Sequence, residues 1–371
     1  MDPAPFNHTI DNTSPLFVYE PNDDGLSPAN GWVTWFSQSG FNTAAGEEAI
    51  GDSRHITSLA GASVSLQFHG AAIWIFGNAS FPFEFTIDGL DPVLQSPLTT
   101  PDPDDVLLAL GLPLDTHLLT ITARPSQSGQ GELFFDKVII TDALPLGAAS
   151  TIPIVIDNQN RTALHYQGNW TTENNDQIPS HDNPKPFMST QDPTGSVALN
   201  FTGALAVAVN GSRNLDHSTY NVSLNGASKT YNASTIWSIG DSVLFYQSGL
   251  DPQSNYTIEM INAPGGLGGK MTINDITLYT PSNATSTDSS QAGSTSTSSP
   301  TNSPTITSHK NHVAVIVGPV VGVVGGLLFI IIGFFLWRKR FRSKPVVQDE
   351  TKQPTPSTPE LSASDQSMLK L

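Results

Sequence analysis

The stretch LFFDKVIIT, residues 133–141, decides the fold because a close counterpart, MTINDITLYT, occupies residues 271–280. In each stretch an Asp, Asp136 or Asp275, stands five residues before a Thr inside an apolar, β-branched run typical of a β-strand. The two Asp residues are 139 positions apart. This repetition indicates one domain used twice, and about 140 residues suffice to bury a core.

Further matches between the two regions extend the repeat. GASVSLQFHGAAIWIFG (61–77) matches GSVALNFTGALAVAVNG (195–211), and FEFTIDG (83–89) matches YNVSLNG (220–226). The last pair ends in D-G and N-G, which are strong signals for hairpin turns. Short alternating strands at regular spacing, with little helical periodicity, predict an all-β fold of two tandem antiparallel jelly-roll β-sandwiches.

The repeat and the shifts in composition set the predicted boundaries. In chain order the predicted segments are an N-terminal segment (1–11), the first β-sandwich (12–143), a linker (144–150), the second β-sandwich (151–280), a disordered Ser/Thr-rich stalk (281–312), one transmembrane α-helix (313–337) and a disordered cytoplasmic tail (338–371). The tail contains two Thr-Pro pairs, and Thr355 and Thr358 are candidates for proline-directed phosphorylation. A passive tail is the alternative.

An apolar run predicts how the chain meets a membrane. Val313–Trp337 carries no charge and is long enough to cross a hydrocarbon core of about 30 Å. The basic stretch RKRFRSK, residues 338–344, marks the cytoplasmic side. We therefore expect a type I single-pass protein of the plasma membrane with its ectodomain outside and its basic tail in the cytoplasm. The start, MDPAPFNHTI, lacks a signal-peptide pattern, so we expect that the signal peptide is missing from this sequence.

Small residues along the predicted span suggest pairing of two chains. Gly318, Gly322 and Gly326 are spaced four apart, which lets two membrane helices approach closely. The partners expected from this segment are therefore the lipid bilayer and a second copy that forms a homodimer. The alternative is that Gly is simply frequent in membrane helices.

Charge and composition narrow the partners of the ectodomain. The net charge is −17, and 29 of the 33 Asp and Glu residues precede residue 313. Such an ectodomain repels phosphate backbones, which excludes nucleic acid as a partner. There is no Cys, so neither disulfides nor thiol chemistry are expected.

Sites for N-glycosylation agree with an exported ectodomain. The N-x-Ser/Thr pattern does not occur after the apolar run. The expected sites are Asn7, Asn12, Asn78, Asn160, Asn169, Asn200, Asn210, Asn221, Asn232, Asn255 and Asn283.

The two copies of the repeat and the overall layout of the chain resemble known surface proteins. The stretches FHGAAIWIFG, FTIDG, LGLPLDTHLLTIT and LFFDKVIIT, with their weaker counterparts in the second copy, are similar to galactose-binding-domain-like β-sandwiches. Such domains occur in tandem in single-pass membrane proteins of mushroom-forming fungi. The resemblance covers about residues 15–340 and implies a carbohydrate-facing fold. The layout is also similar to that of fungal cell-wall integrity sensors, which carry different ectodomains.

Motifs with catalytic or metal chemistry are weak in this chain. GDS at residues 51–53 and GDSVL at residues 240–244 resemble the nucleophile block of GDSL-type hydrolases, but a Ser nucleophile needs an α/β scaffold and a His base. Acidic pairs at Asp23–Asp24 and in PDPDD, residues 101–105, could instead hold a structural Ca²⁺, although solvated turns explain them better. We expect no catalytic residues, no metal site and no cofactor, and hence no enzyme.

Aromatic residues give the candidate ligand site. Trp32 and Trp35 follow the acidic pair Asp23 and Asp24, and Tyr166 and Trp170 stand at the matching place of the second copy. Aromatic faces can stack on sugars, and the alternative is that these rings fill the core. Because Trp32 has no counterpart in the second copy, we expect it to be the better exposed candidate.

From these features we expect a carbohydrate-binding or cell-wall sensing and adhesion protein with a cell-wall glycan as its partner. Two alternatives remain. One is protein–protein adhesion without a glycan ligand, and the other is the GDSL-like hydrolase.

Overall fold

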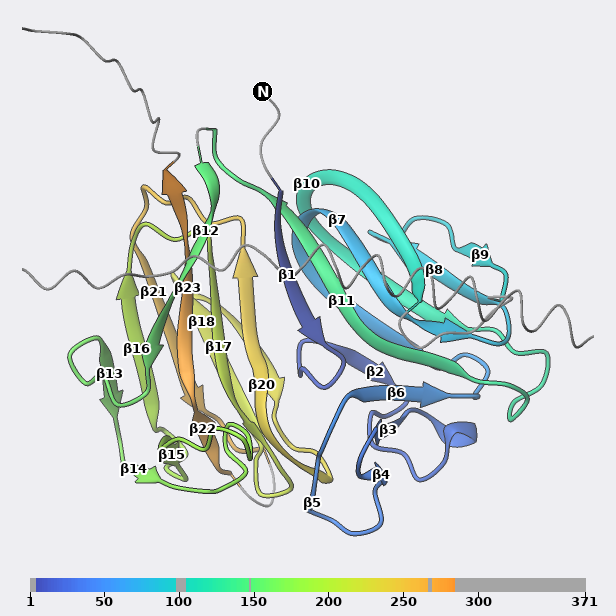
Figure 1. Ribbon diagram of the computed structural model, residues 1–371, viewed down its shortest axis with the longest axis horizontal. Coiled ribbons are helices and arrows are strands. Elements are labelled where there is room, and N and C mark those ends of the chain that lie inside the picture. The colour runs from blue at the N-terminus through green and yellow to red at the C-terminus, as the bar shows by residue number, and fades with distance from the viewer. Residues whose placement is uncertain (1–4, 98–104, 147, 266–268, 284–371) are drawn as a thin grey trace, which may run out of the picture. The chain divides into compact units, whose positions relative to one another are not determined.

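The computed structural model describes residues 5–97, 105–146, 148–265 and 269–283, and these are almost all β-structure (Figure 1). The described residues contain no α-helix and one short 3-10 turn, η1 (Pro28–Asn30). The all-β prediction is confirmed at this level. No described helix is long and apolar enough to cross a membrane. The predicted membrane span, its Gly318, Gly322 and Gly326, and the tail with Thr355 and Thr358 lie outside the described residues.

The strands fall into two halves of the chain, which both belong to one compact unit, Met1–Ser289. The first half carries β1 (Pro5–Asp11), β2 (Val18–Glu20), β3 (Val33–Phe36), β4 (Gly40–Phe41), β5 (Glu47–Glu48), β6 (Ser53–Thr57), β7 (Ser63–Ala79), β8 (Phe83–Ile87), β9 (Val93–Gln95), β10 (Val106–Ala123) and β11 (Leu133–Ala143). The second half carries β12 (Ala148–Asp157), β13 (Leu164–Gln167), β14 (Trp170–Glu173), β15 (Phe187–Thr190), β16 (Ser196–Phe201), β17 (Ala206–Arg213), β18 (Thr219–Leu224), β19 (Ala227–Asn232), β20 (Trp237–Ser248), β21 (Tyr256–Asn262), β22 (Met271–Ile273) and β23 (Asp275–Asn283).

In the first half, the long strands β7 and β10 each extend through both layers of the sheet. The strand order is β4-β3-β6-β11-β7-β10-β8-β9, with β1 paired to β11 and β2 to β7. The beginning of β7 pairs with the end of β10, and its later part pairs with β11 and with the beginning of β10. Between these parts lies Gly70, where a Cβ atom would come within 2.9 Å of Ile140 Cγ2 and of the Thr141 carbonyl oxygen. Glycine therefore permits the close approach of β7 to β11 at this point.

The second half repeats the pattern of one layer. Its sheet order β12-β23-β17-β20 corresponds to β1-β11-β7-β10 in the first half, and all of these pairs are antiparallel. Facing this layer is a second sheet, β13-β16-β21-β18-β19, and Phe245 of β20 packs edge-on against Tyr231 of β19 across the core. A small sheet, β14-β15-β22, completes this half.

The register shows that the two repeated Asp residues are not equivalent. Val138 pairs with Ile10 and Ile75, and Ile276 pairs with Ile156 and Val209. One position earlier stand Lys137 and Asp275, so the match of Asp136 with Asp275 is displaced by one residue. The cause is a β-bulge in β11 between Phe135 and Lys137, which adds a residue to that strand.

The two halves are joined by a continuous apolar core. The outward face of β23, β17 and β20 packs on side chains of β1, where the rings of His8 and Tyr246 stack at 3.9 Å and those of Phe6 and Tyr279 lie 5.3 Å apart. At the other end β5 of the first half pairs in parallel with β20, and Phe36 packs against Trp237 at 4.7 Å. The buried apolar residues of both halves belong to one cluster, and the predicted division into two sandwiches at residues 144–150 stays a prediction.

A buried arginine adds polar contacts across the same boundary. Arg213, from β17, donates hydrogen bonds to the carbonyl oxygens of Thr13 and Ser234 and lies 3.5 Å from the Asp23 carboxylate. Beside it the Asp24 carboxylate accepts a hydrogen bond from the Ile236 amide at 3.2 Å. The acidic pair of the sequence is thus part of the contact between the halves.

Removing the arginine should destabilise the protein. Arg213→Ala takes the arginine donor from the Ser234 carbonyl oxygen, leaves the Thr13 carbonyl oxygen with the 3.4 Å hydrogen bond from Ser242 Oγ, and removes the ion pair of Asp23. The free energy of unfolding should therefore fall by about 1.5–3 kcal/mol. The control is Arg124→Ala, which breaks the exposed ion pair with Glu84 and should cost less than about 1 kcal/mol. Denaturant unfolding of the full chain measures both, and equal losses would contradict the assigned role.

The stacked His8 should make stability depend on pH. Burial lowers the pKa of His8 to about 4, whereas the unfolded chain titrates near 6.5. Between these values the unfolded state binds the extra proton, so this residue makes stability fall as the pH falls. Relative to His8→Phe, which keeps an apolar ring on Tyr246, the wild type should lose about 2 kcal/mol between pH 7 and pH 5. Parallel stability curves for the two proteins over this range would refute the prediction.

Candidate functional site

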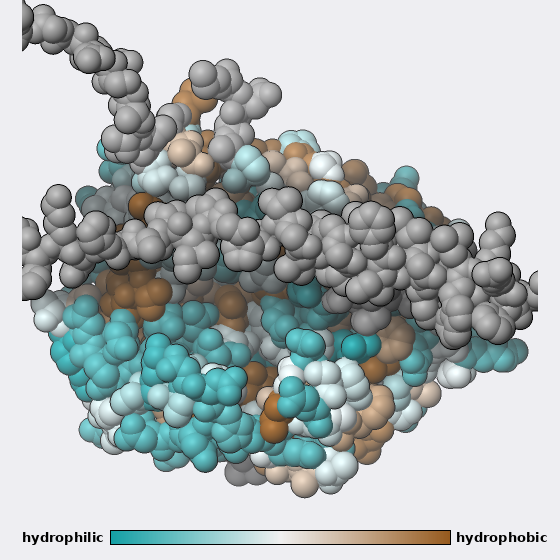
Figure 2. Space-filling model, viewed as in Figure 1, coloured by the Kyte–Doolittle hydropathy of each residue, from teal (hydrophilic) through white to brown (hydrophobic). Residues whose placement is uncertain are grey.

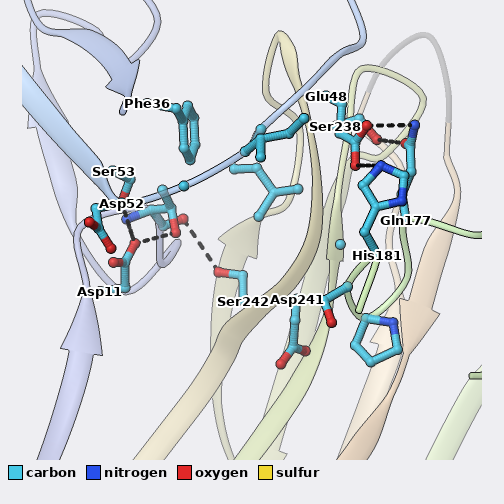
Figure 3. Close-up of a pocket in the computed structure, with 18 of the residues that line it drawn as sticks. Asp11, Phe36, Glu48, Asp52, Ser53, Gln177, His181, Ser238, Asp241 and Ser242 are labelled. Carbon is cyan, nitrogen blue, oxygen red and sulfur yellow. Dashed lines mark hydrogen bonds and ion pairs between the residues drawn. The ribbon is translucent and has the colours of Figure 1, made fainter. Parts of the chain in front are cut away.

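A cleft of about 960 Å³ opens where the two halves meet (Figure 3). Its walls carry five carboxylates, no described Lys or Arg, and a single imidazole, that of His181. The carboxylates belong to both halves, and they are Asp11, Glu48, Asp52, Asp182 and Asp241. The cleft is therefore an anionic space that exists only when the halves are together.

On the first-half side, the end of β1 and the start of β6 hold the acidic wall. Ser53 Oγ donates to Asp11 Oδ1 at 2.9 Å, and Thr13 Oγ1 donates to the same oxygen at 2.6 Å. Asn12 Nδ2 donates to Ser53 Oγ at 2.6 Å, so a buried amide fixes the serine. Asp52 is exposed beside this group. Figure 3 shows Asp11, Asp52 and Ser53 together on one side of the cleft.

On the second-half side, Asp241 in β20 is the most perturbed carboxyl. Desolvation raises the pKa of Asp241, a hydrogen bond from Asn274 Nδ2 at 2.8 Å lowers it, and the negative charge of Asp275 raises it. The net pKa is about 6, although the residue keeps surface that is exposed to solvent. This carboxyl therefore changes charge in the mildly acidic range. Such a carboxyl in a cleft is typical of a functional site, although structural networks also produce it.

A second polar group closes the cleft at the parallel strand pair. His181 Nε2 lies 2.7 Å from Glu48 Oε1, and Gln177 Nε2 donates to Glu48 Oε2 at 3.2 Å. Ser238 Oγ in turn donates to Gln177 Oε1 at 3.2 Å. The Glu48 carboxylate comes from the first half and its two partners come from the second, so this group joins the walls.

The structure brings the two GDS strings of the sequence to this one cleft. Residues 51–53 line it from the first half, and residues 240–242 line it from the second. Ser242 is buried and donates to the Thr13 carbonyl oxygen at 3.4 Å, while Ser53 is bound to Asp11. Neither the Ser53 nor the Ser242 hydroxyl is bonded to a histidine. The two GDS motifs therefore contribute polar residues to the lining of the cleft and do not form the activated serine that the motif suggested.

The expectation for Trp32 was wrong. Its side chain is 0 % exposed, and its Nε1 donates to the Ser63 carbonyl oxygen at 3.0 Å within the first-half core. Tyr19 packs against it edge-on at 5.4 Å. A ring without exposed surface offers no face to a ligand.

The other predicted site residues lie in separate places. Trp35 in β3 is half-buried, and the guanidinium of Arg54 covers its ring at 4.5 Å. Tyr166 and Trp170 contact each other edge-on at 4.9 Å in the second half, and Trp170 Nε1 donates to the Ser196 carbonyl oxygen. Burial raises the pKa of Tyr166 above its usual range. The structure therefore does not gather these aromatic residues into one site.

Asp23 and Asp24 serve the contact between the halves, as described above. Burial raises the pKa of Asp24, and the charge of Asp23 adds to that effect. Within the described ranges, which omit residues 101–104, no group of three or more His, Asp or Glu side chains is placed to hold a metal ion.

Two of the predicted glycosylation sites are corrected by burial. Asn12 is 0 % exposed and bonds to Ser53 and His55, and Asn78 is 3 % exposed. Asn210 and Asn221 are half-buried, and Asn210 donates to Asp275. The exposed candidates are Asn7, Asn160, Asn169, Asn200, Asn232 and Asn255.

The comparisons with known proteins give weak similarities. No protein-family model and no curated protein matches the sequence. A solved Paenibacillus xanthan lyase aligns at a TM-score of 0.27 and 12% identity over 67% of this chain, which spans 26% of the lyase. The plant receptor-like kinase ANX2 aligns at 0.26 and 9%, covering 76% of this chain and 97% of that one. A cycloalternan-forming enzyme from Listeria monocytogenes aligns at 0.26 and 12%, covering 62% and 20%.

The expectation that the chain is not an enzyme is corrected by these comparisons. The matched structures include a xanthan lyase and a cycloalternan-forming enzyme. At these TM-scores the similarities assign no activity to this chain.

Burial predicts which sequons accept a glycan. In protein secreted from a eukaryotic host, peptide mapping should find glycans at exposed sites such as Asn160 and Asn200, because a bulky, hydrophilic glycan has to remain on the surface of the folded protein. Asn12 and Asn78 should remain unmodified in the folded protein. A glycan found at Asn12 would contradict the bonds that this residue makes to Ser53 and His55.

Proposed function

We propose that this protein is a cell-surface glycan-binding protein and that the acidic cleft is its binding site. The observation that carries the proposal is the set of five carboxylates that two different halves place around one space of about 960 Å³. This volume is within the range of ligand pockets, roughly 300–1,000 Å³, and suits several sugar rings.

The chemistry of the walls suits a polyhydroxylated ligand. Sugar hydroxyls donate hydrogen bonds, and the cleft offers carboxylates together with the amide of Gln177 and the hydroxyl of Ser238 as partners. Charge-assisted hydrogen bonds to carboxylates are stronger than those between neutral groups.

The excess of negative charge favours a cationic glycan. A sugar with a protonated amine gains attraction from Asp52 and Asp241, whereas a uronic acid is repelled. We therefore propose oligomers of an amino sugar as the ligand class. The proposal includes galactose-binding-like jelly-roll sandwiches as the fold family and residues 313–337 as the membrane anchor that keeps this site outside the cell.

Titration calorimetry with the full chain tests this function. A glucosamine hexamer should bind, and a glucose hexamer, which lacks the charged amines, should bind at least about tenfold more weakly, a difference of about 1.4 kcal/mol. Asp241→Asn and Asp52→Asn should each weaken the glucosamine hexamer by a similar factor. Asp115→Asn, an exposed carboxylate that does not line the cleft, is the matched control.

The pH dependence should identify Asp241. Because this carboxyl ionises near pH 6, affinity for the amino sugar should rise between pH 5 and pH 6.5. Asp241→Asn should flatten this rise, while the titration of the ligand itself affects both proteins equally. Equal affinity for the glucose and glucosamine hexamers would defeat the proposal. Binding of a Lys-rich peptide in place of both sugars would support the alternative of protein–protein adhesion.

A second candidate, glycan cleavage, is favoured by Asp241 alone. A carboxyl with a pKa near 6 holds a proton at mildly acidic pH, as the general acid of a glycoside hydrolase does. Incubation of the glucosamine hexamer with wild type and Asp241→Asn, followed by measurement of new reducing ends, decides the point. Release by wild type and not by the variant would establish cleavage, and release by neither would leave binding as the function.

A further inference from the structure

The contact between the two halves uses two surfaces, and the repeat provides each surface twice. One surface is the row of side chains on β1 that includes Phe6 and His8, which we call the strand edge. The other is the outward face of β23, β17 and β20 with Tyr246 and Tyr279, which we call the sheet face. Inside the chain, the sheet face of the second half covers the strand edge of the first half.

The second half carries a strand edge of its own on β12. In the register given above, Ile152 and Ile154 occupy the positions of Phe6 and His8. The covered pair, Phe6 and His8, is 7% and 8% exposed, whereas Ile152 is 51% and Ile154 48% exposed. Within the described residues, this second strand edge is an apolar surface that nothing covers.

The first half carries a sheet face of its own on β11, β7 and β10. Trp74 pairs with Ile139 and Ala109, as Ala208 pairs with Thr277 and Tyr246 in the second half. Trp74 is 44% exposed, and Val106 on the neighbouring strand is also exposed. On the face in view, Figure 2 shows apolar residues scattered among hydrophilic ones.

The free strand edge and the free sheet face are complementary in side-chain size. Compared with the pair of surfaces buried inside the chain, the large and small residues are on opposite sides. Within the chain, the rings of Phe6 and His8 lie over a face that is small at its centre, where Ala206 and Ala208 stand. The free strand edge presents the smaller Ile152 and Ile154, and the free sheet face presents the larger Trp74 at the position of Ala208. Exchange of a large and a small residue across a contact keeps the total volume, which packed interfaces tolerate best.

We propose that the sheet face around Trp74 of one chain docks on the strand edge Ile152–Ile154 of a second copy. The contact repeats between chains the docking that joins the halves within a chain. It is heterologous, because each chain contributes a different surface, and so it generates a row of copies in place of a closed dimer. The internal interface is the reason for naming a second copy of this chain as the occupant.

Charge sets the conditions for this association. The chain has a net charge of −17, so two copies repel each other, while Trp74, Ile152 and Ile154 are uncharged. Salt screens the repulsion over distances of about 10 Å at 0.1 M and leaves the apolar contact intact. Association should therefore strengthen between 0.05 M and 0.5 M NaCl.

A complementation experiment tests the arrangement with the full chain in detergent micelles. All chains carry Gly322→Ile, which removes pairing through the predicted span, and Asn7→Gln, which keeps a glycan off the neighbouring strand. In sedimentation velocity, Trp74→Glu and Ile154→Glu should each weaken self-association by at least about tenfold, since either places a charge in an apolar contact. A mixture of the two variants should form one-to-one pairs, because each retains the surface that the other lacks.

The mixture also shows that both variants are folded, since only folded chains can complement each other. The matched control is Leu118→Glu, an equally exposed apolar residue at 49% that lies on neither surface; it should associate like the parent chain. Three results would overturn the proposal: a monomeric parent chain at 0.5 M NaCl, undiminished association of either variant, or a mixture that stays monomeric.

Discussion

The stacking of His8 on Tyr246 marks the constraint on which the rest of the structure depends: the first half cannot cover its own edge strand. Phe6, His8 and Ile10 alternate into the buried side of β1, and rings of a second-half sheet, Tyr279 and Tyr246, lie against Phe6 and His8. Apolar burial of this kind is the main favourable term in folding. Once the halves are fixed in this way, Asp11 at the end of β1 must face Asp241 in β20, and the acidic cleft is the result.

The polar contacts between the two halves fix how the halves are placed more than they strengthen the contact. Arg213 bonds to two carbonyl oxygens, one from each side of the boundary, and so it favours one placement of the halves over others that would bury a similar apolar area. Removing charges from water offsets much of the gain from such pairs, so we infer specificity as their main effect. The same contacts hold the carboxylates of the cleft at fixed spacing, as the proposed recognition of a sugar would require.

Much of the fold could be predicted from local sequence patterns, because alternating strand residues and turn residues are close neighbours in the sequence. The repeat was visible for the same reason, yet the bulge beside Lys137 displaced its register by one, and no local pattern signals an added residue. Trp32 was misjudged because its environment depends on a partner 31 residues away, the Ser63 carbonyl oxygen. The cleft could not be predicted, since its residues come from both halves and only the contact between the halves collects them. The two GDS motifs do lie in the lining of the cleft, but they contribute polar side chains there and not a nucleophile.

The course of β23 has a mechanical consequence. Its first residue, Asp275, bonds to Asn210 at the border of the cleft, and the chain leaves the strand at Asn283. β23 is flanked by β12 and β17, whose hydrogen bonds run perpendicular to it. A pull between a ligand in the cleft and the chain beyond Asn283 acts along this strand, so it loads both ladders in shear and all of their hydrogen bonds at once. Unzipping, which breaks such bonds one at a time, needs a pull in another direction. Tension between the cleft and Asn283 would therefore be borne by the paired strands β12, β23 and β17 together.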